Sequence, residues 1–332
     1  MPTRRSALAL LGASTLAACA GTAGSVPRRI ELQGHRGARG LWPENTLAGF
    51  AAALALGVDT LELDVGVTKD GVPVVSHDAR LNPDITRGPD GQFLSGRGPA
   101  IAELTLAELS AYDVGRLRPG SAYARQFPEQ TPVDGARIPR LSEVIALLLR
   151  SGAHGVQLAV ETKVNPLKPE DTLPVADFTR AAIDTLRAGG VARRTTLQSF
   201  DWRTLRQVAR EAPGMETAHL TLRRPSLDNV APGSPWTAGF DLRDHGSVPR
   251  LVKAAGGRTW SSFHGDLDAA AIAEAQALGL KVLAWTVNEP ARMAQLMDMG
   301  VDGIITDRPD LLRTLMAQRS MPLPPPRPVR PA

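Results

Sequence analysis

The alternation of short apolar runs with longer helix-forming stretches is the feature that most limits how this chain can fold. Eight runs rich in Val, Ile, Leu and Thr are predicted as strands, at residues 30–33, 60–67, 156–161, 195–198, 217–221, 259–262, 281–287 and 303–306. Between most of them lie Ala- and Leu-rich stretches predicted as helices, at residues 47–56, 141–149, 178–187, 202–211, 269–278 and 289–297. Repeated strand–helix alternation favours a parallel sheet with helical crossovers.

The number of units and the length of the chain favour a closed barrel. Eight strand–helix units fit a TIM (β/α)8 barrel, which typically takes about 250 residues. A doubly wound open sheet is the rival, but the Gly-rich dinucleotide turn that often accompanies it is missing. Much of the extra length lies in a Gly- and Pro-rich block at residues 79–140, after the second strand. We therefore predict an α/β fold, a barrel over residues 30–318 with this block as an insertion capping its mouth.

The charge of the chain is concentrated at its ends. Basic residues outnumber acidic ones 38 to 34, a formal net charge of +4. Residues 1–30 hold four Arg and residues 319–332 hold three, with no acidic residue in either segment. Without these seven, 31 basic residues stand against 34 acidic ones. Because nucleic-acid binding needs clustered positive charge on the folded body, no nucleic-acid partner is expected. The sequence indicates no particular oligomeric state.

The amino terminus has the pattern of an export signal. Residues 1–18 combine a basic start with an apolar stretch too short to span a membrane, which is typical of a signal peptide. The sequence Leu16-Ala17-Ala18-Cys19 resembles the lipobox of bacterial lipoproteins, which implies a lipid-modified Cys19 followed by a tether over residues 19–29. An ordinary signal peptide with an incidental Cys is the alternative. We expect an exported protein on the periplasmic side of the cell envelope, anchored to a membrane through the lipid.

The carboxyl terminus differs in composition from the rest of the chain. Residues 321–332 contain six Pro, which favours an extended conformation without internal hydrogen bonds. We therefore predict a Pro-rich, disordered and mobile tail over residues 319–332.

Polar residues that can carry chemistry follow the first predicted strand. His35 can transfer a proton near neutral pH, and the Arg36 guanidinium can bind a phosphate or carboxylate through two hydrogen bonds. Glu44, Asn45 and Thr46 stand just before a predicted helix, and we interpret them as helix-capping and first-turn residues.

Carboxylates occupy alternate positions on the next strands. Glu62 and Asp64 are two residues apart, so they share one face of their strand, and Glu161 brings a third carboxylate with Lys163 beyond it. His77 follows a short hairpin strand. Buried carboxylates are costly unless a cation pairs with them, so either a salt-bridge network or a hard divalent cation is expected. With two histidines, the set suits a metal-assisted reaction on a phosphate ester.

The ordered set of motifs resembles a known enzyme family. His35-Arg36, Glu44-Asn45, Glu62-x-Asp64 and His77-Asp78 resemble the signature of the glycerophosphodiester phosphodiesterase family, and Glu161-x-Lys163, Trp285-Thr286-Val287-Asn288 and Asp302–Asp307 resemble its later motifs. The resemblance covers residues 30–315. It implies a barrel with an insertion after the second strand, and hydrolysis of glycerophosphodiesters to glycerol 3-phosphate and an alcohol.

The resemblance also implies a role for each matching residue. It implies that His35 and His77 are the general acid and base. It implies that one Ca²⁺ or Mg²⁺ is bound by Glu62, Asp64 and Glu161. It also implies that Arg36 and Lys163 contact the phosphate and that Trp285 lines the glycerol end of the pocket. The family's chemistry passes through a cyclic phosphate, which two histidines of ordinary pKa could serve by exchanging roles. One departure is Ala159, where many members carry Asn, so a polar contact near the ligands is expected to be missing.

Two other functions stay open at this point. A related barrel enzyme would cleave intact or lyso-phospholipids and leave a cyclic phosphate, and a non-catalytic surface lipoprotein would keep the fold as a binding module. The complete set of histidines and carboxylates favours the hydrolase. Phe200, Trp202 and Trp236 are interpreted as packing residues.

Overall fold

The computed structural model describes residues 29–329. The predicted signal peptide, Cys19 and the tether up to residue 28 lie outside these residues. Among the helices of residues 29–329, none combines the length and the apolar character that crossing a membrane requires.

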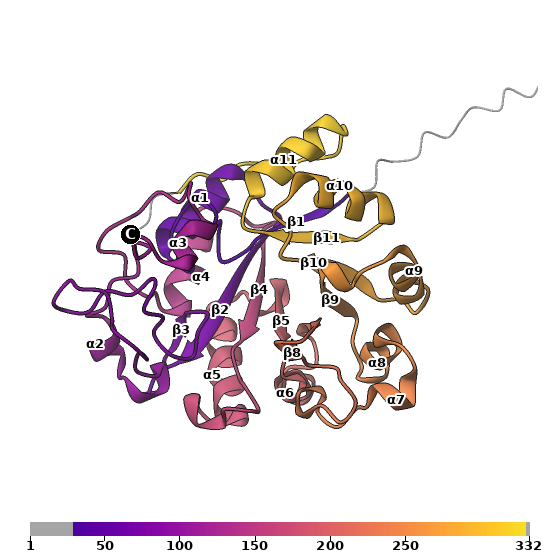
Figure 1. Ribbon diagram of the computed structural model, residues 1–332, viewed down its shortest axis with the longest axis horizontal. Coiled ribbons are helices and arrows are strands. Elements are labelled where there is room, and N and C mark those ends of the chain that lie inside the picture. Colours follow the sequence, from indigo (N-terminus) through magenta and orange to yellow (C-terminus); the bar gives the residue numbers. More distant parts are fainter. Residues whose placement is uncertain (1–28, 330–332) are drawn as a thin grey trace, which may run out of the picture.

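Within the described residues, eight parallel strands close into a barrel (Figure 1). They are β1 (Glu31–Gly34), β2 (Thr60–Val67), β4 (Gln157–Thr162), β5 (Thr195–Ser199), β6 (Glu216–Thr221), β9 (Thr259–Phe263), β10 (Lys281–Trp285) and β11 (Gly303–Thr306). The barrel closes because β1 pairs with β11 on one side and with β2 on the other. The predicted TIM (β/α)8 barrel is confirmed.

Helices surround the strands (Figure 1). They are α1 (Leu47–Leu56), α4 (Leu141–Arg150), α5 (Val175–Ala188), α6 (Trp202–Glu211), α7 (Leu242–His245), α8 (Val248–Ala254), α9 (Ala269–Ala277), α10 (Pro290–Met299) and α11 (Pro309–Gln318). Short 3₁₀ turns are η2 (Pro169–Asp171), η3 (Ala192–Arg194), η4 (Pro235–Thr237) and η5 (His264–Asp266), and a small hairpin joins β7 (Arg223–Arg224) to β8 (Leu227–Asp228). The alternation along β2 sends Leu61, Leu63 and Val65 into the hydrophobic core, so Glu62 and Asp64 point into the barrel.

The block between β3 (Pro73–Val75) and α4 forms a small lobe of its own. It contains η1 (Ile101–Glu103), α2 (Leu106–Leu109) and α3 (Ala122–Gln126). Its core is a separate hydrophobic cluster that includes Leu81, Ile101 and Leu109. The strand β3 pairs antiparallel with β2, which ties the lobe to the strand that carries two of the carboxylates.

The tail after α11 corrects one expectation. Residues 319–329 are not a free segment, because they pack along α1. The backbone N–H of Arg327 donates to the carbonyl oxygen of Leu54 at 2.7 Å, and Arg313 donates to the carbonyl of Pro324 at 2.7 Å. Met321 and Val329 pack against the core. A Pro-rich segment has few hydrogen bonds of its own, so its carbonyls are available to donors on the barrel.

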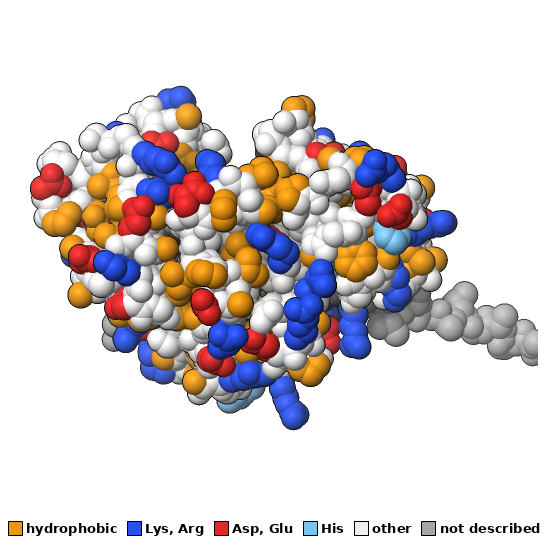
Figure 2. All heavy atoms as spheres, turned by 90° about the horizontal axis from the view of Figure 1, so that it is seen from below, with side chains coloured by type: hydrophobic (Ala, Val, Ile, Leu, Met, Phe, Trp, Pro, Cys, Tyr) orange, Lys and Arg blue, Asp and Glu red, His pale blue; other side chains and the backbone are white. Residues whose placement is uncertain are grey.

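Charges of both signs are mixed over the molecular surface. On the face shown in Figure 2, Lys and Arg side chains lie among Asp and Glu and hydrophobic ones. Many are paired; Arg180 on α5, for example, contacts Asp177 at 3.4 Å and Glu211 at 3.1 Å. Such exposed pairs contribute less than about 1 kcal/mol each.

Candidate active site

The candidate residues meet at the carboxyl ends of the strands. His35 directly follows β1, Glu62 and Asp64 lie on β2, Glu161 lies near the end of β4, and Trp285 ends β10. Parallel strands place all their carboxyl ends at one end of a barrel, which is where TIM-barrel enzymes build their sites. The fold therefore brings together residues that are far apart in the sequence.

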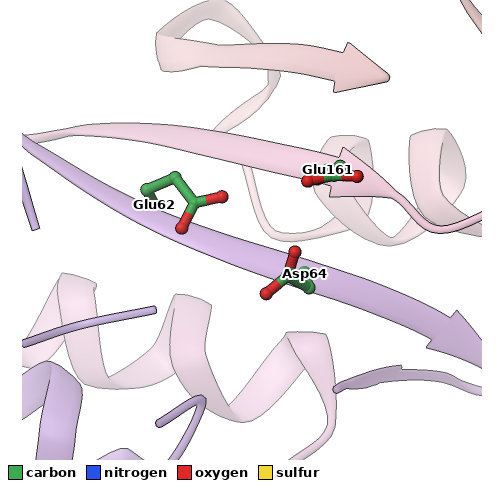
Figure 3. Close-up of side chains that lie close together, drawn as sticks. All are labelled: Glu62, Asp64 and Glu161. Carbon is green, nitrogen blue, oxygen red and sulfur yellow. The ribbon is translucent and has the colours of Figure 1, made fainter. Parts of the chain in front are cut away.

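Three carboxylates form a compact cluster inside this end of the barrel. Glu62, Asp64 and Glu161 each offer an oxygen, and these oxygens lie within 4.8 Å of one another (Figure 3). The strand register explains the contact, because Asp64 on β2 pairs with Glu161 on β4. All three side chains are buried. Burial, followed by the neighbouring Asp64 and Glu161 charges, raises the pKa of Glu62 well above its usual range.

Two cations hold this cluster in place. Arg36 Nε lies 3.2 Å from Asp64 Oδ2, and Lys163 Nζ lies 2.7 Å from Glu161 Oε1 and 3.7 Å from Asp64 Oδ1. Burial alone would raise the pKa of Asp64, but Arg36 and the other nearby cations lower it below the usual range. Burial raises the pKa of Glu161 to about 7, although Lys163 opposes the shift. The salt-bridge network that the sequence left open is thus present.

The same cluster fits a divalent cation. Asp64 Oδ1 is buried and accepts no hydrogen bond, although Lys163 Nζ lies 3.7 Å away, so this oxygen keeps a lone pair for a ligand. Three carboxylate oxygens in contact are the kind of ligand that Mg²⁺ and Ca²⁺ prefer. The residues present therefore suit the metal site that the sequence resemblance implies.

Each of the two histidines contacts a carboxylate through its Nδ1 ring nitrogen. His35 Nδ1 lies 2.6 Å from Asp307 Oδ1, and His77 Nδ1 lies 2.8 Å from Asp78 Oδ1. A carboxylate at Nδ1 places the proton there and leaves the Nε2 lone pair available. His35 Nε2 is 4.0 Å from Glu62 Oε2.

Both histidine pKa values differ from the ordinary values expected from the sequence. Burial, with help from Arg39 and Arg36, lowers the pKa of His35 although Asp307 opposes the shift. Burial, then Arg36 and Lys163, lowers the pKa of His77 well below its usual range. In the protein without substrate, both rings are therefore neutral near pH 7 and able to accept a proton.

Glu44 and Asn45 belong to the site rather than to a helix cap. Thr46 alone caps α1, with its Oγ accepting from Gly49 N–H at 3.1 Å. Asn45 Nδ2 donates to Asp64 Oδ2 at 2.9 Å, and Glu44 accepts from Arg36 Nη1 at 2.8 Å. Asn45 and Arg36 have φ values of 55° and 50°. This left-handed backbone costs of order 1 kcal/mol or more at each residue, which the buried hydrogen bonds offset.

Sequence reasoning also missed several supporting residues. Asp307 accepts from His35, from Arg39 Nε at 2.9 Å and Nη2 at 3.0 Å, and from Asn288 Nδ2 at 2.7 Å. Asp307 and Asn288 end two of the motifs quoted above, so their positions carried a signal although no role was assigned. Tyr123 of the insertion donates to Glu44, and no local pattern marks it.

Ala159 offers the carboxylate cluster no polar side chain, but a neighbouring strand does. Gln198 on β5 donates through Nε2 to Glu62 Oε1 at 2.9 Å. Ala159 instead lines a cavity of about 950 Å³ at the other end of the barrel, where the strands begin. The substitution of a small residue there leaves the carboxylate cluster supported.

Two adjoining cavities open onto the cluster. The inner one, of about 120 Å³, is lined by His35, Arg36, Arg39, Glu62, His77, Glu161, Lys163, Gln198, Phe200, Leu220, Trp285, Thr286 and Ile305. The outer one, of about 400 Å³, is lined by His77, Asp78, Ala79, Glu161, Lys163, Val164, Asn165, Phe200, Leu222, Leu227, Trp236 and Trp285. Phe200 and Trp236, interpreted from sequence as packing residues, are thus cavity walls, whereas Trp202 is buried against His219.

Comparison with known proteins agrees with this geometry. A sequence model of the glycerophosphoryl diester phosphodiesterase family matches residues 35–311. The chain belongs to this family. The family expected from the motifs is confirmed, and so is the expected enzyme class, glycerophosphodiester phosphodiesterase.

Relatives of this family cover nearly the whole described chain. The glycerophosphodiester phosphodiesterase of Caldanaerobacter subterraneus subsp. tengcongensis is 28% identical over 282 residues, 85% of this chain and 96% of the relative. The glycerophosphodiester phosphodiesterase of Bacillus subtilis is 28% identical over 289 residues, 86% of each chain. A crystal structure named "putative glycerophosphoryl diester phosphodiesterase", from Silicibacter pomeroyi, is 37% identical with a TM-score of 0.79, covering 89% of this chain and 95% of that one.

Proposed function

We propose that this enzyme hydrolyses glycerophosphodiesters to glycerol 3-phosphate and an alcohol, with a bound Mg²⁺ or Ca²⁺ and with His35 and His77 as acid and base. The observation that carries the proposal is a single cavity. Its 120 Å³ are lined by both histidines, by Glu62 and Glu161 of the carboxylate cluster, and by three cationic side chains, Arg36, Arg39 and Lys163.

The balance of charge supports a metal-dependent reaction. The three cations of this cavity, Arg36, Arg39 and Lys163, already contact carboxylates of the site. A phosphodiester adds a further negative charge to this buried region. A divalent cation held by Glu62, Asp64 and Glu161 would offset that charge and polarise the phosphoryl group. Arg36 and Lys163 could then turn toward the phosphate oxygens.

The histidines supply the proton transfers of the proposed route. One Nε2 accepts the proton of the glycerol 2-hydroxyl as that oxygen attacks phosphorus, and the other ring protonates the oxygen of the departing alcohol. Water then opens the cyclic phosphate with the two roles reversed. The acid must begin protonated; a bound phosphodiester favours this because its negative charge lies beside both rings. Trp285 lines both cavities and would close the glycerol side.

The test measures hydrolysis of several substrates under several metal conditions by a purified protein of residues 20–332, which contains the whole barrel. Glycerophosphocholine, glycerophosphoethanolamine and a long-chain lysophospholipid are assayed with Mg²⁺, with Ca²⁺ and with a chelator, and products are identified by phosphorus NMR. We expect glycerol 3-phosphate as a product from the first two substrates. A chelator should abolish this activity, and adding a divalent cation should restore it. Turnover of the lysophospholipid alone, with a cyclic phosphate as the product, would support the lyase alternative instead.

We also propose that the protein is exported and anchored by a lipid on Cys19, on the periplasmic side of the envelope. The support is the basic start, the short apolar stretch and the lipobox-like sequence ending at Cys19. The test is metabolic labelling with a fatty-acid probe in a bacterial host, followed by membrane fractionation. Labelled protein in the membrane fraction is expected for the natural chain and not for Cys19→Ser. Equal labelling of both chains, or of neither, would contradict the anchor.

A further inference from the structure

The outer cavity differs in chemistry from the inner one that it adjoins. The two share His77, Glu161, Lys163, Phe200 and Trp285, so a molecule can extend from one into the other. The inner cavity, at about 120 Å³, has the volume of about four water molecules, which is too small for a whole glycerophosphodiester. The outer cavity, of about 400 Å³, is the adjoining space into which the alcohol half of the substrate would extend.

Aromatic rings form much of the outer wall. The Phe200 ring is edge-on to Trp285, with centroids 5.4 Å apart and planes at 90°, and to Trp236, with centroids 6.5 Å apart and planes at 79°. Leu222 and Leu227, from the hairpin that carries β7 and β8, add to the apolar lining. The indole N–H of Trp285 donates to the carbonyl of Ser261 at 3.0 Å, so that ring offers the cavity its surface rather than a hydrogen bond.

The Trp236 wall is fixed before any ligand arrives. Trp236 is only 7% exposed, and it lies on η4, whose first turn is capped by Ser234 Oγ accepting from Trp236 N–H at 3.3 Å. A rigid aromatic ring beside a reactive centre loses little conformational freedom on binding. A polyol would fit this wall poorly, because its hydroxyl groups would have few hydrogen-bond partners there.

The charges around the outer cavity complement a cation. The lining holds Asp78, Glu161 and the ammonium of Lys163, but Glu161 contacts Lys163 and belongs to the proposed metal cluster, so Asp78 is the carboxylate left for a cationic head group. Lys163 lies at the inner boundary, where its Nζ contacts Glu161 at 2.7 Å and is 6.0 Å from the Phe200 ring centroid. Lys163 is the single Lys or Arg among the described residues that line this cavity. A cationic head group in this cavity would lie among the rings of Phe200, Trp236 and Trp285.

We infer that the outer cavity binds a quaternary ammonium head group, so that choline-type glycerophosphodiesters are preferred substrates. This rests on the proposed function and specifies its alcohol. A trimethylammonium group suits these walls because it is cationic, has no N–H to satisfy and binds aromatic faces. Trp236 and Phe200 would be the residues that determine this specificity.

The test compares substrates of the same shape with and without the charge. The kcat/KM of glycerophosphocholine is measured beside that of its neutral carbon isostere, the 3,3-dimethylbutyl ester, and that of glycerophosphoglycerol. We expect glycerophosphocholine to exceed the isostere about tenfold, equivalent to about 1.4 kcal/mol. Equal values for the two would overturn the inference and identify a merely apolar cavity.

Variants assign the preference to the aromatic wall. In Trp236→Leu the ratio should fall to about twofold, whereas Trp236→Phe, which keeps an aromatic face, should retain most of it. Phe240→Leu is the matched control, because Phe240 lies on the same segment but not in the cavity lining, and it should leave the ratio unchanged. An unchanged ratio in a folded Trp236→Leu protein would refute the assignment. If that variant does not fold, a selectivity lost in Trp236→Phe or in Phe240→Leu refutes it.

Failure of this inference is distinguishable from failure of the proposed function. If none of the three diesters is hydrolysed under any metal condition, the proposed function is wrong. If all three are hydrolysed with similar kcat/KM, the function stands and only the head-group assignment fails.

Discussion

Replacing Asp307 by Asn should inactivate the enzyme through His35, although the hydrogen bonds that Asp307 accepts come from none of the three clustered carboxylates. Asp307 is buried and accepts four hydrogen bonds, one from His35, two from Arg39 and one from Asn288. An amide offers one oxygen where the carboxylate offers two. If its NH₂ group faces His35, it must donate to Nδ1, which moves the ring proton to Nε2 and removes the lone pair that accepts the substrate proton.

The size of the effect follows from these contacts. A wrong histidine tautomer costs up to about 10⁴ in kcat in catalytic triads, so we expect kcat/KM to fall at least about 10²-fold. The substitution also removes the closer of the two carboxylates of the mostly buried Arg39, which keeps Glu44 at 4.0 Å, and we expect a loss of about 3 kcal/mol in the free energy of unfolding. With about 300 folded residues, the unfolding entropy is ~0.6 kcal/mol/K, so Tm should fall by about 5 °C.

The dependence on pH adds a second readout. Burial would raise the pKa of Asp307, but His35 and Arg39 lower it below its usual range. A carboxyl group with a lowered pKa stabilises the fold above its ordinary pKa of about 3.9, and this contribution disappears as the pH falls. The difference in stability between the natural protein and Asp307→Asn should therefore narrow below about pH 4.

The assay pairs steady-state kinetics with thermal unfolding followed by circular dichroism. The control is Asp310→Asn, which removes a partly exposed partner of Arg308 near the start of α11 and should cost less than about 1 kcal/mol with no loss of activity. Asp307→Asn protein that is folded and keeps more than about a tenth of its activity would refute the argument that Asp307 sets the tautomer of His35.

Three further predictions concern the site itself. His35→Ala and His77→Ala should each lower kcat/KM at least about 10²-fold while Tm stays within a few degrees, and near-normal turnover by either would exclude that histidine. Glu161→Gln should weaken Mg²⁺ or Ca²⁺ binding at least about tenfold by calorimetry, whereas unchanged affinity would remove Glu161 from the ligands. Because burial raises the pKa of Glu161 to about 7 and also that of Glu62, the folded protein holds protons that the unfolded chain has already lost. His35 and His77 have lowered pKa values and oppose this trend below about pH 7, where the unfolded chain protonates them. In chelator, Tm should therefore fall from about pH 7 to pH 8, and a divalent cation should remove that fall; a rise in this range would contradict the glutamate shifts.

Local patterns were sufficient for most of the barrel. The strands β2 (Thr60–Val67) and β11 (Gly303–Thr306) and the helices α1 (Leu47–Leu56) and α6 (Trp202–Glu211) have the predicted bounds. Each combines a clear hydrophobic period with a turn or cap at its ends. The helix α8 (Val248–Ala254) was not predicted, since its seven residues contain Pro and two basic side chains.

The sequence predicted only part of the chemistry of the site. Period-two alternation on β2 was enough to place Glu62 and Asp64 on one face, and parallel pairing brought Glu161 beside them. The histidine pKa values were misjudged, because burial and the neighbouring cations depend on the folded surroundings rather than on nearby sequence. The same is true of Trp236, whose segment shows no signal for a cavity wall.

The sequence by itself determined the barrel, the strands that carry the reactive residues and the identity of the acidic cluster, because strand period and residue type are local properties. Only the tertiary structure decided which side chains orient the reactive ones. His35 and Asp307 are 272 residues apart and meet because Gly34 pairs with Thr306 when the first and last strands close the barrel. Tyr123 reaches Glu44 for a similar reason, since the insertion folds back over the barrel mouth. Contacts of this kind arise from closure and packing over the whole chain, and no short stretch of sequence encodes them.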